Sequence, residues 1–135
     1  MSTACAAMLR SYLAPRALPL PDAEGRATVI FDGRHRVHLQ AGSDGRVVVR
    51  ARLIDLPPFG ARRDALLVDI ARRAAVAASA TRQPVPACVV DAREEAVWLQ
   101  LRHAPDGTAA DFATALGGFV DWLTFWKRHL EWMSS

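Results

Sequence analysis

Hydrophobic and polar positions repeat with two different periods along this chain, and the changes of period divide it into elements. Apolar residues recur every three or four positions in residues 3–13, 62–81 and 108–133, which predicts three helices. Between the helices, short apolar or alternating segments bounded by turn residues predict five strands, at residues 27–32, 34–41, 46–54, 87–91 and 96–103. The expected order is α-β-β-β-α-β-β-α. The fold class is therefore α+β, an antiparallel twisted sheet packed by helices.

The first three strands form a meander with two different faces. Asp32-Gly33 is a strong signal for a tight hairpin between the first two strands. In the second strand Val37 and Leu39 point to one side and Arg36 and His38 to the other. The third strand repeats this alternation, so one face of the meander is apolar and the other carries several cations.

The last helix has the clearest boundaries. Thr108 and Asp111 have the spacing of a capping box at its start. An apolar stripe then runs from Phe112 to Met133, and further aromatic residues widen it in the second half. Gly117-Gly118 lies within this helix, where it is expected to allow close packing.

The middle helix has an inner stripe whose second half is all alanine. Asp69 and Arg73 can pair across one turn on its outer side. The stripe consists of Leu67, Ile70, Ala71, Ala74, Ala77 and Ala78. Together with the wide aromatic stripe of the last helix, this gives more apolar surface than one small core uses, which favours association of the chain with a partner.

Length and composition restrict the class of protein. The 135 residues fit a single domain, residues 1–135, and with 51% hydrophobic and 23% charged residues the chain is neither disordered nor a membrane protein. No apolar run approaches the roughly 20 residues that span a bilayer, and the first residues lack the pattern of a signal peptide. We therefore expect a cytoplasmic protein without membrane insertion. Cys5 and Cys88 are too few for a disulfide framework.

The charge leaves two alternatives open. Seventeen basic residues against fourteen acidic ones give a net charge of +3, and sixteen of the seventeen are arginine. One face of the meander is predicted to carry Arg34, Arg36, His38, Arg50 and Arg52, which a small basic nucleic-acid-binding regulator would use. Single-strand binding needs aromatic residues among the cations, however, and these strands supply only Phe31. A solvated polar face is the favoured interpretation.

No catalytic or metal site is expected. His35 and His38 point to opposite sides of a strand, so they do not suit one metal ion. Glu94-Glu95 lies in a hairpin turn, and no nucleophile or phosphate-binding motif is present. We therefore expect no enzyme activity, no cofactor and no metal.

The whole pattern resembles class I type III secretion chaperones, the Tir-chaperone (CesT/SycE-like) family. The resemblance rests on the order of elements, the connector Leu-Pro-Leu-Pro-Asp before the first hairpin, and Val97-Trp-Leu-Gln-Leu-Arg102 before a long helix that ends in tryptophan. It implies a cytoplasmic homodimer that binds the N-terminal segment of a secreted effector in extended form. The chaperone keeps the effector soluble and presents it to the secretion apparatus.

The resemblance also implies two sets of site residues. The dimer interface would involve Leu67, Ile70, Ala71, Ala74 and Trp98. The effector would add a strand to the sheet and press apolar side chains into a groove. That groove would be formed by Leu9, Tyr12, Leu13, Leu18, Leu20, Val29, Phe31, Val37 and Leu39.

Two features differ from the usual pattern of this family. Its members are typically acidic, whereas this chain is basic. The middle helix is also richer in alanine and arginine, which implies a closer or differently angled dimer contact. The basic charge keeps nucleic acid open as the less favoured partner.

Overall fold

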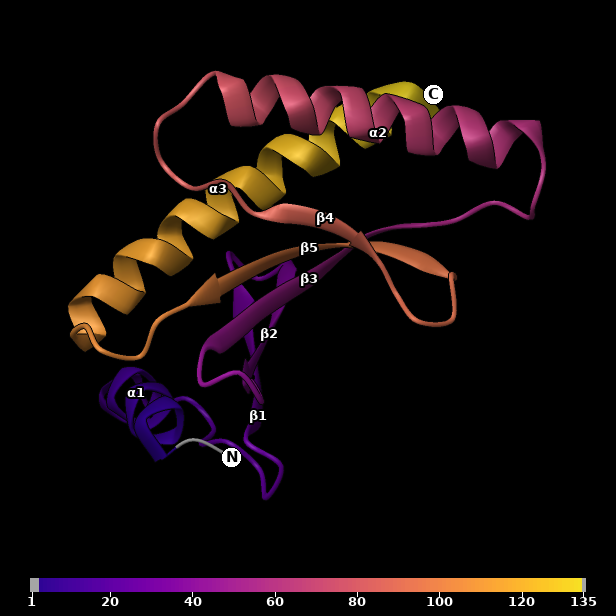
Figure 1. Ribbon diagram of the computed structural model, residues 1–135. Coiled ribbons are helices and arrows are strands. Elements are labelled where there is room, and N and C mark those ends of the chain that lie inside the picture. The colour runs from indigo at the N-terminus through magenta and orange to yellow at the C-terminus, as the bar shows by residue number, and fades with distance from the viewer. Residues whose placement is uncertain (1–2, 135) are drawn as a thin grey trace.

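The computed structural model describes residues 3–134 and has the predicted order of elements (Figure 1). A short 3-10 turn, η1, follows the first helix because Pro15 ends it. The bounds are α1 Thr3–Leu13, η1 Ala14–Arg16, β1 Arg26–Phe31, β2 His35–Ala41, β3 Val47–Asp55, α2 Ala61–Ser79, β4 Ala87–Val90, β5 Ala96–His103 and α3 Ala109–Ser134.

The five strands form one antiparallel sheet in the order β1-β2-β3-β5-β4. Asp32 and Gly33 both have positive φ, at 53° and 68°, which confirms the tight turn between β1 and β2. β3 pairs with β5, so the second hairpin extends the first meander. A bulge between Arg52 and Ile54 shifts the register there and interrupts the alternation of β3 near its end.

The core lies between one face of the sheet and the helices α1 and α3. Alternate residues of β1, β2, β3 and β5 are buried, as the sequence pattern predicts. The stripe of α3 is buried from Phe112 to Leu130, while the side chain of Met133 lies outside the described residues. Figure 1 shows α1 beside the start of α3, and the ring of Tyr12 meets that of Phe112 edge-on at 5.4 Å.

The capping box at the start of α3 is confirmed. Thr108 N donates to Asp111 Oδ2 over 3.0 Å, and Asp111 N donates to Thr108 Oγ1 over 3.1 Å. The backbone hydrogen bond from Thr108 is the main cause that lowers the pKa of Asp111. This carboxylate therefore fixes the first turn of the helix that supplies the largest buried side chains of the core, Trp126, Phe112 and Phe119.

Helix α2 lies at the opposite end of the molecule from α1, over the second half of α3 (Figure 1). His129 on α3 approaches Asp69 on α2, with 2.9 Å between Nε2 and Oδ2. Asp69 therefore pairs with another helix rather than with Arg73, contrary to the prediction. Only part of the alanine stripe is buried, since Ile70 and Ala77 face the fold while Ala71 is exposed.

The prediction of close packing at Gly117-Gly118 is wrong. Both glycines are exposed, and a Cβ added to either would have no heavy atom within 4 Å outside the adjacent helix backbone. We expect Gly117→Ala and Gly118→Ala each to raise the free energy of unfolding by about 0.5–1 kcal/mol, because alanine loses less backbone entropy in a helix. Urea unfolding measures this. A loss of stability in either variant would mean that another backbone packs against this surface.

Candidate functional site

The connector between η1 and β1, residues 17–25, covers the beginning of the sheet edge. Asp22 Oδ1 accepts hydrogen bonds from the backbone N–H groups of Glu24 and Arg26, each over 2.9 Å, and Asp22 N donates to Arg26 O over 2.9 Å. The backbone hydrogen bond from Arg26 is the largest cause that lowers the pKa of Asp22. Both peptide groups of Arg26 that face outward are therefore satisfied within the chain.

Within residues 3–134, no strand pairs with the rest of the β1 edge. Ala41 N on β2 donates to Gly25 O over 3.2 Å, so the peptide groups of Gly25 face β2. Peptide groups alternate along an antiparallel strand, which directs those of Thr28 and Ile30 to the outside, beyond the Asp22 cap. Thr28 and Ile30 therefore present a short row of N–H and C=O groups to which an extended chain can bind.

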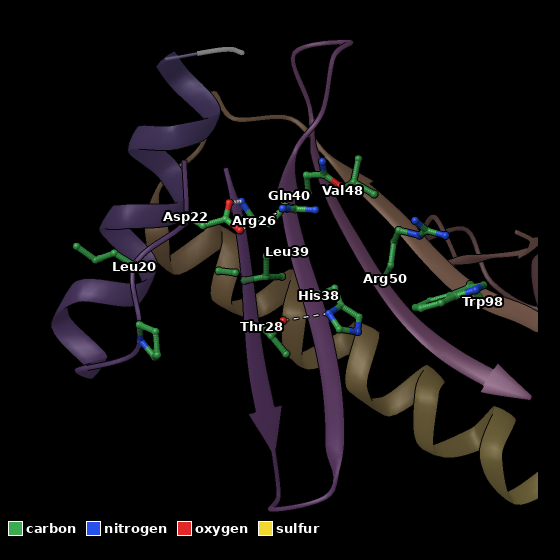
Figure 2. A pocket seen from close by; sticks show the side chains of 12 residues that line it. Leu20, Asp22, Arg26, Thr28, His38, Leu39, Gln40, Val48, Arg50 and Trp98 are labelled. Carbon is green, nitrogen blue, oxygen red and sulfur yellow. Dashed lines mark hydrogen bonds and ion pairs between the residues drawn. The ribbon is translucent and has the colours of Figure 1, made fainter. Parts of the chain in front are cut away.

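The face of the sheet that points away from α1 and α3 is open and hollowed (Figure 2). Its hollow has a volume of about 670 Å³ and extends from the connector to Trp98. Thr28, His38, Arg50 and Gln100 lie opposite one another in a row across four strands. The lining is mixed, because Leu20 and Val48 add apolar surface between the polar groups.

Trp98 is held in place on this face. Its Nε1 donates to Asp91 Oδ2 over 3.3 Å, and the guanidinium carbon of Arg50 lies 4.7 Å from the centre of the ring. Figure 2 shows Arg50 above the indole, with His38 nearby. The centres of the His38 and Trp98 rings are 5.9 Å apart. Of Phe, Tyr and Trp, the three strands of the meander contain only Phe31, and β5 adds Trp98 to the cationic face by pairing with β3.

The surroundings of His38 favour its neutral form. Burial is the main cause that lowers its pKa, and the positive charges of Arg36 and Arg50 lower it further. Its Nδ1 lies 3.0 Å from Thr28 Oγ1, which links β1 and β2 on the open face. The positive charge of the centre of this face therefore comes from arginine side chains at neutral pH.

The structure divides the nine residues predicted for the groove into two groups. Leu20 is 55% exposed beside the hollow, and Leu18 and Phe31 are half-buried at the edge of the core. The other six side chains are buried and support the sheet from within. They are Leu9, Tyr12, Leu13, Val29, Val37 and Leu39.

The residues predicted for the dimer interface lie on two elements. Trp98 is on the open face of β5, whereas the other four lie along α2. Ile70 is buried within the fold, Leu67 and Ala74 are half-buried, and Ala71 is exposed. Val68 and Val76 add further exposed apolar surface to α2, at 48% and 60%.

An apolar cleft of about 420 Å³ lies between α2 and α3. Val76 and Ala77 line one side, and Trp122 and Phe125 line the other. Trp122 and Phe125, two of the aromatic residues that widen the apolar stripe of α3, therefore face α2 rather than the sheet.

Residues 3–134 contain no group of three or more side chains that could hold a metal ion. His35 is buried on the core side of β2 and His38 lies on the open side, as their spacing predicts. Burial raises the pKa of the Cys88 thiol to about 11, so this cysteine is unreactive at neutral pH.

His35 is expected to make folding sensitive to acid. Lys127 Nζ lies 3.4 Å from its Nδ1, and Thr124 Oγ1 lies 3.4 Å from its Nε2. Burial, and then the charges of Lys127 and Arg34, lower the pKa of His35 below its ordinary value of 6.5, while Asp32 opposes them. The unfolded chain therefore binds a proton at a higher pH than the folded chain, and stability falls as the pH drops below about 6.5.

The measurement for this prediction is the free energy of unfolding from pH 7 to pH 5. The parent chain should lose up to about 1.4 kcal/mol per pH unit more than His35→Gln, since one titrating group contributes at most that slope. The other titrating groups, His38 included, are common to both proteins. Parallel curves would contradict the prediction.

Comparison with known proteins places this architecture among secretion chaperones. The model of the Tir chaperone protein (CesT) family matches residues 17–127. No curated protein matches the chain in sequence. No helix within residues 3–134 has the length and apolarity needed to cross a membrane.

Three solved structures have a similar fold. The ExsC-ExsE complex matches with a TM-score of 0.65 and 21% identity over 95% of this chain and 96% of the other. The HopA1-SchA chaperone-effector complex matches with 0.63 and 13% identity over 90% and 91%. The Yersinia pestis type III secretion chaperone SycH, in complex with a stable fragment of YscM2, matches with 0.61 and 19% identity over 90% and 98%. None of these findings supports a nucleic-acid-binding role.

Proposed function

The chain belongs to the Tir chaperone protein (CesT) family and is a type III secretion chaperone that binds effectors, and we propose that it holds an effector's N-terminal segment in extended form along β1. The observation that carries this proposal is the uncapped part of the β1 edge. There Thr28 and Ile30 direct unpaired peptide groups outward, beside a hollow on the open face. An added strand would gain backbone hydrogen bonds from this edge.

Apolar side chains beside the edge provide the second part of the binding. Leu20 is 55% exposed and Ile30 is 57% exposed, one on the connector and one on β1. Leu18 and Phe31 are half-buried close by in sequence. Covering these side chains with apolar groups of the client removes them from water, which favours the bound state. The six buried residues of the predicted groove would keep this edge rigid.

We further propose that the active form is a homodimer of this single domain, residues 1–135, in the bacterial cytoplasm. The exposed apolar side of α2, with Val68, Ala71 and Val76, supports a contact between two copies. Contact between two copies would remove these side chains from water, which favours association. The loaded chaperone would then present the effector to the secretion apparatus, without a cofactor.

The first test is purification of the tagged chain from its native bacterium, with nuclease and at two salt concentrations, followed by mass spectrometry. We expect one larger protein in stoichiometric amount at high salt. Its N-terminal fragment, co-expressed with the chain, should form the same complex, whereas its remaining C-terminal part should not. Binding through the C-terminal part alone would contradict the proposal.

The edge itself is tested by Ile30→Pro. Proline removes the outward N–H of this position and is tolerated on an edge strand, so the fold should remain intact. We expect at least a tenfold loss of affinity for the N-terminal fragment, because a strand bound at this edge loses a hydrogen bond and meets the proline ring. Ile30→Thr, which keeps the N–H, is the matched control. Equal affinities for the two variants would exclude strand addition at this edge.

A further inference from the structure

The open face of the sheet carries five arginine side chains, and their partners divide them into a rim and a centre. Three of them pair with carboxylates around the rim: Arg26 with Asp22 and Glu24 at 3.4 Å each, Arg102 with Asp44 at 3.4 Å, and Arg52 with Asp55 at 2.6 Å.

The two central arginines are not neutralised in this way. Within residues 3–134, neither Arg36 nor Arg50 forms an ion pair. Arg36 is exposed, and Arg50 is half-buried in the hollow. His38 lies on β2, two residues from Arg36 and opposite Arg50 on β3, and its lowered pKa favours the neutral form. The centre of the face therefore has a positive charge that no residue of the rim compensates.

Arg50 has the geometry of a fixed anion-binding group. Its guanidinium lies over Trp98, whose ring is itself held by Asp91. Its Nε is buried and has no hydrogen-bond partner, which is rare for a polar atom in a folded protein. A guanidinium that is already oriented loses little side-chain entropy when it binds a carboxylate, and it can bind both oxygens.

The shape of the face suits one extended polypeptide. The hollow of about 670 Å³ adjoins a second one of about 590 Å³, and Gln40, Val48 and Arg50 line both. Together they reach from the connector beside β1 to the turn between β2 and β3. A chain that leaves the β1 edge can therefore continue across the sheet and pass Arg50.

We propose that this face binds an acidic stretch of the client, with carboxylates at Arg50 and Arg36. The proposal rests on the function proposed above and adds the charge of the client segment that is bound. A nucleic acid fits less well for two reasons. Arg50 covers the ring of Trp98, which removes a stacking surface for bases. The rim carboxylates Asp22, Glu24, Asp44 and Asp55 would repel a continuous row of phosphates, whereas a peptide can place its charges between them.

The test uses a fluorescein-labelled peptide of about twelve residues in which Glu alternates with Val, so that one side of the extended chain is acidic. A second peptide has Gln in place of Glu. Fluorescence anisotropy at low salt and at about 0.2 M salt measures binding to the full chain, to Arg50→Gln and to Arg82→Gln. Arg82 is an exposed arginine in the loop after α2 and serves as the matched control.

We expect the Glu peptide to bind at least tenfold more tightly than the Gln peptide, and Arg50→Gln to remove about tenfold of that affinity. Arg82→Gln should leave it unchanged. Equal binding of the two peptides, no binding of either, or equal loss in the two variants would overturn the proposal. Tighter binding of a labelled oligo-dT of similar length would overturn it in favour of nucleic acid.

Failure of this proposal is distinguishable from failure of the proposed function. If Ile30→Pro abolishes binding of the client fragment while Arg50→Gln leaves the Glu peptide unaffected, strand addition stands and the acidic preference is wrong. If binding of the Glu peptide depends on Arg50 and the client fragment binds Ile30→Pro normally, the acidic preference stands and strand addition at β1 is wrong.

Discussion

Ala71→Glu is expected to convert the proposed homodimer into monomers. Ala71 lies on the exposed side of α2 in the single chain, so glutamate there leaves folding intact. In a dimer formed through α2, the same carboxylate would be buried without a partner, which costs about 3–5 kcal/mol. Light scattering should therefore report a particle of 14.7 kDa for the variant and twice that mass for the parent chain.

The choice of Ala71 follows from the burial of its neighbours. A charge at Ile70 would disrupt the core of the single chain, since that side chain is only 4% exposed. Ala110→Glu is the matched control because Ala110 is exposed in the first turn of α3, at the other end of the molecule (Figure 1). A dimer that survives Ala71→Glu would show that the contact lies on another element.

Arg63→Ala is expected to lower the free energy of unfolding by about 3 kcal/mol. The side chain of Arg63 is only 6% exposed. Its Nη1 donates to Pro57 O over 3.2 Å, and its Nη2 donates to Glu94 O over 3.1 Å. Its guanidinium carbon lies 4.1 Å from the ring centre of Phe59. It thereby joins the start of α2 to the loop before it and to the turn between β4 and β5. Removal leaves the carbonyl groups of Pro57 and Glu94 without this donor.

Thermal unfolding should show a decrease in Tm of about 10 °C for this variant. Arg62→Ala is the control, because Arg62 is next to Arg63 in the sequence, carries the same charge and is exposed. Arg63→Lys should recover only part of the loss, because a single ammonium group cannot reproduce the planar guanidinium fork. Equal Tm values for Arg62→Ala and Arg63→Ala would show that the hydrogen bonds of Arg63 contribute little.

The local pattern of the sequence predicts the elements of this fold well, because each of them buries one face. Alternation in β2 and β5 gives the correct inner and outer residues, and the Thr108–Asp111 spacing marks the start of α3. The order of strands is not a local property. The pairing of β3 with β5, which brings Trp98 beside Arg50, depends on the packing of the whole sheet.

The candidate site was less predictable because it depends on tertiary contacts. An arginine in the first turn of a helix ordinarily points to solvent, so nothing in the sequence distinguishes Arg63 from Arg62. Asp69 has a suitable partner four residues later, yet the crossing of α2 and α3 brings His129 to it. Asp22 did carry a signal: an aspartate shortly before a glycine is typical of a turn in which its side chain binds the backbone.

The Asp22 cap also bears on how the protein avoids aggregation. An unpaired strand edge is a template on which other chains, including copies of the same protein, can extend the sheet into insoluble assemblies. Asp22 occupies both outward groups of Arg26 and leaves only the short stretch from Thr28 onward open. A short open edge that ends at the charged turn with Asp32 and Arg34 is a poorer template for such assemblies than a long one. The carboxylate that limits the binding edge would therefore also disfavour edge-to-edge aggregation of the free chaperone.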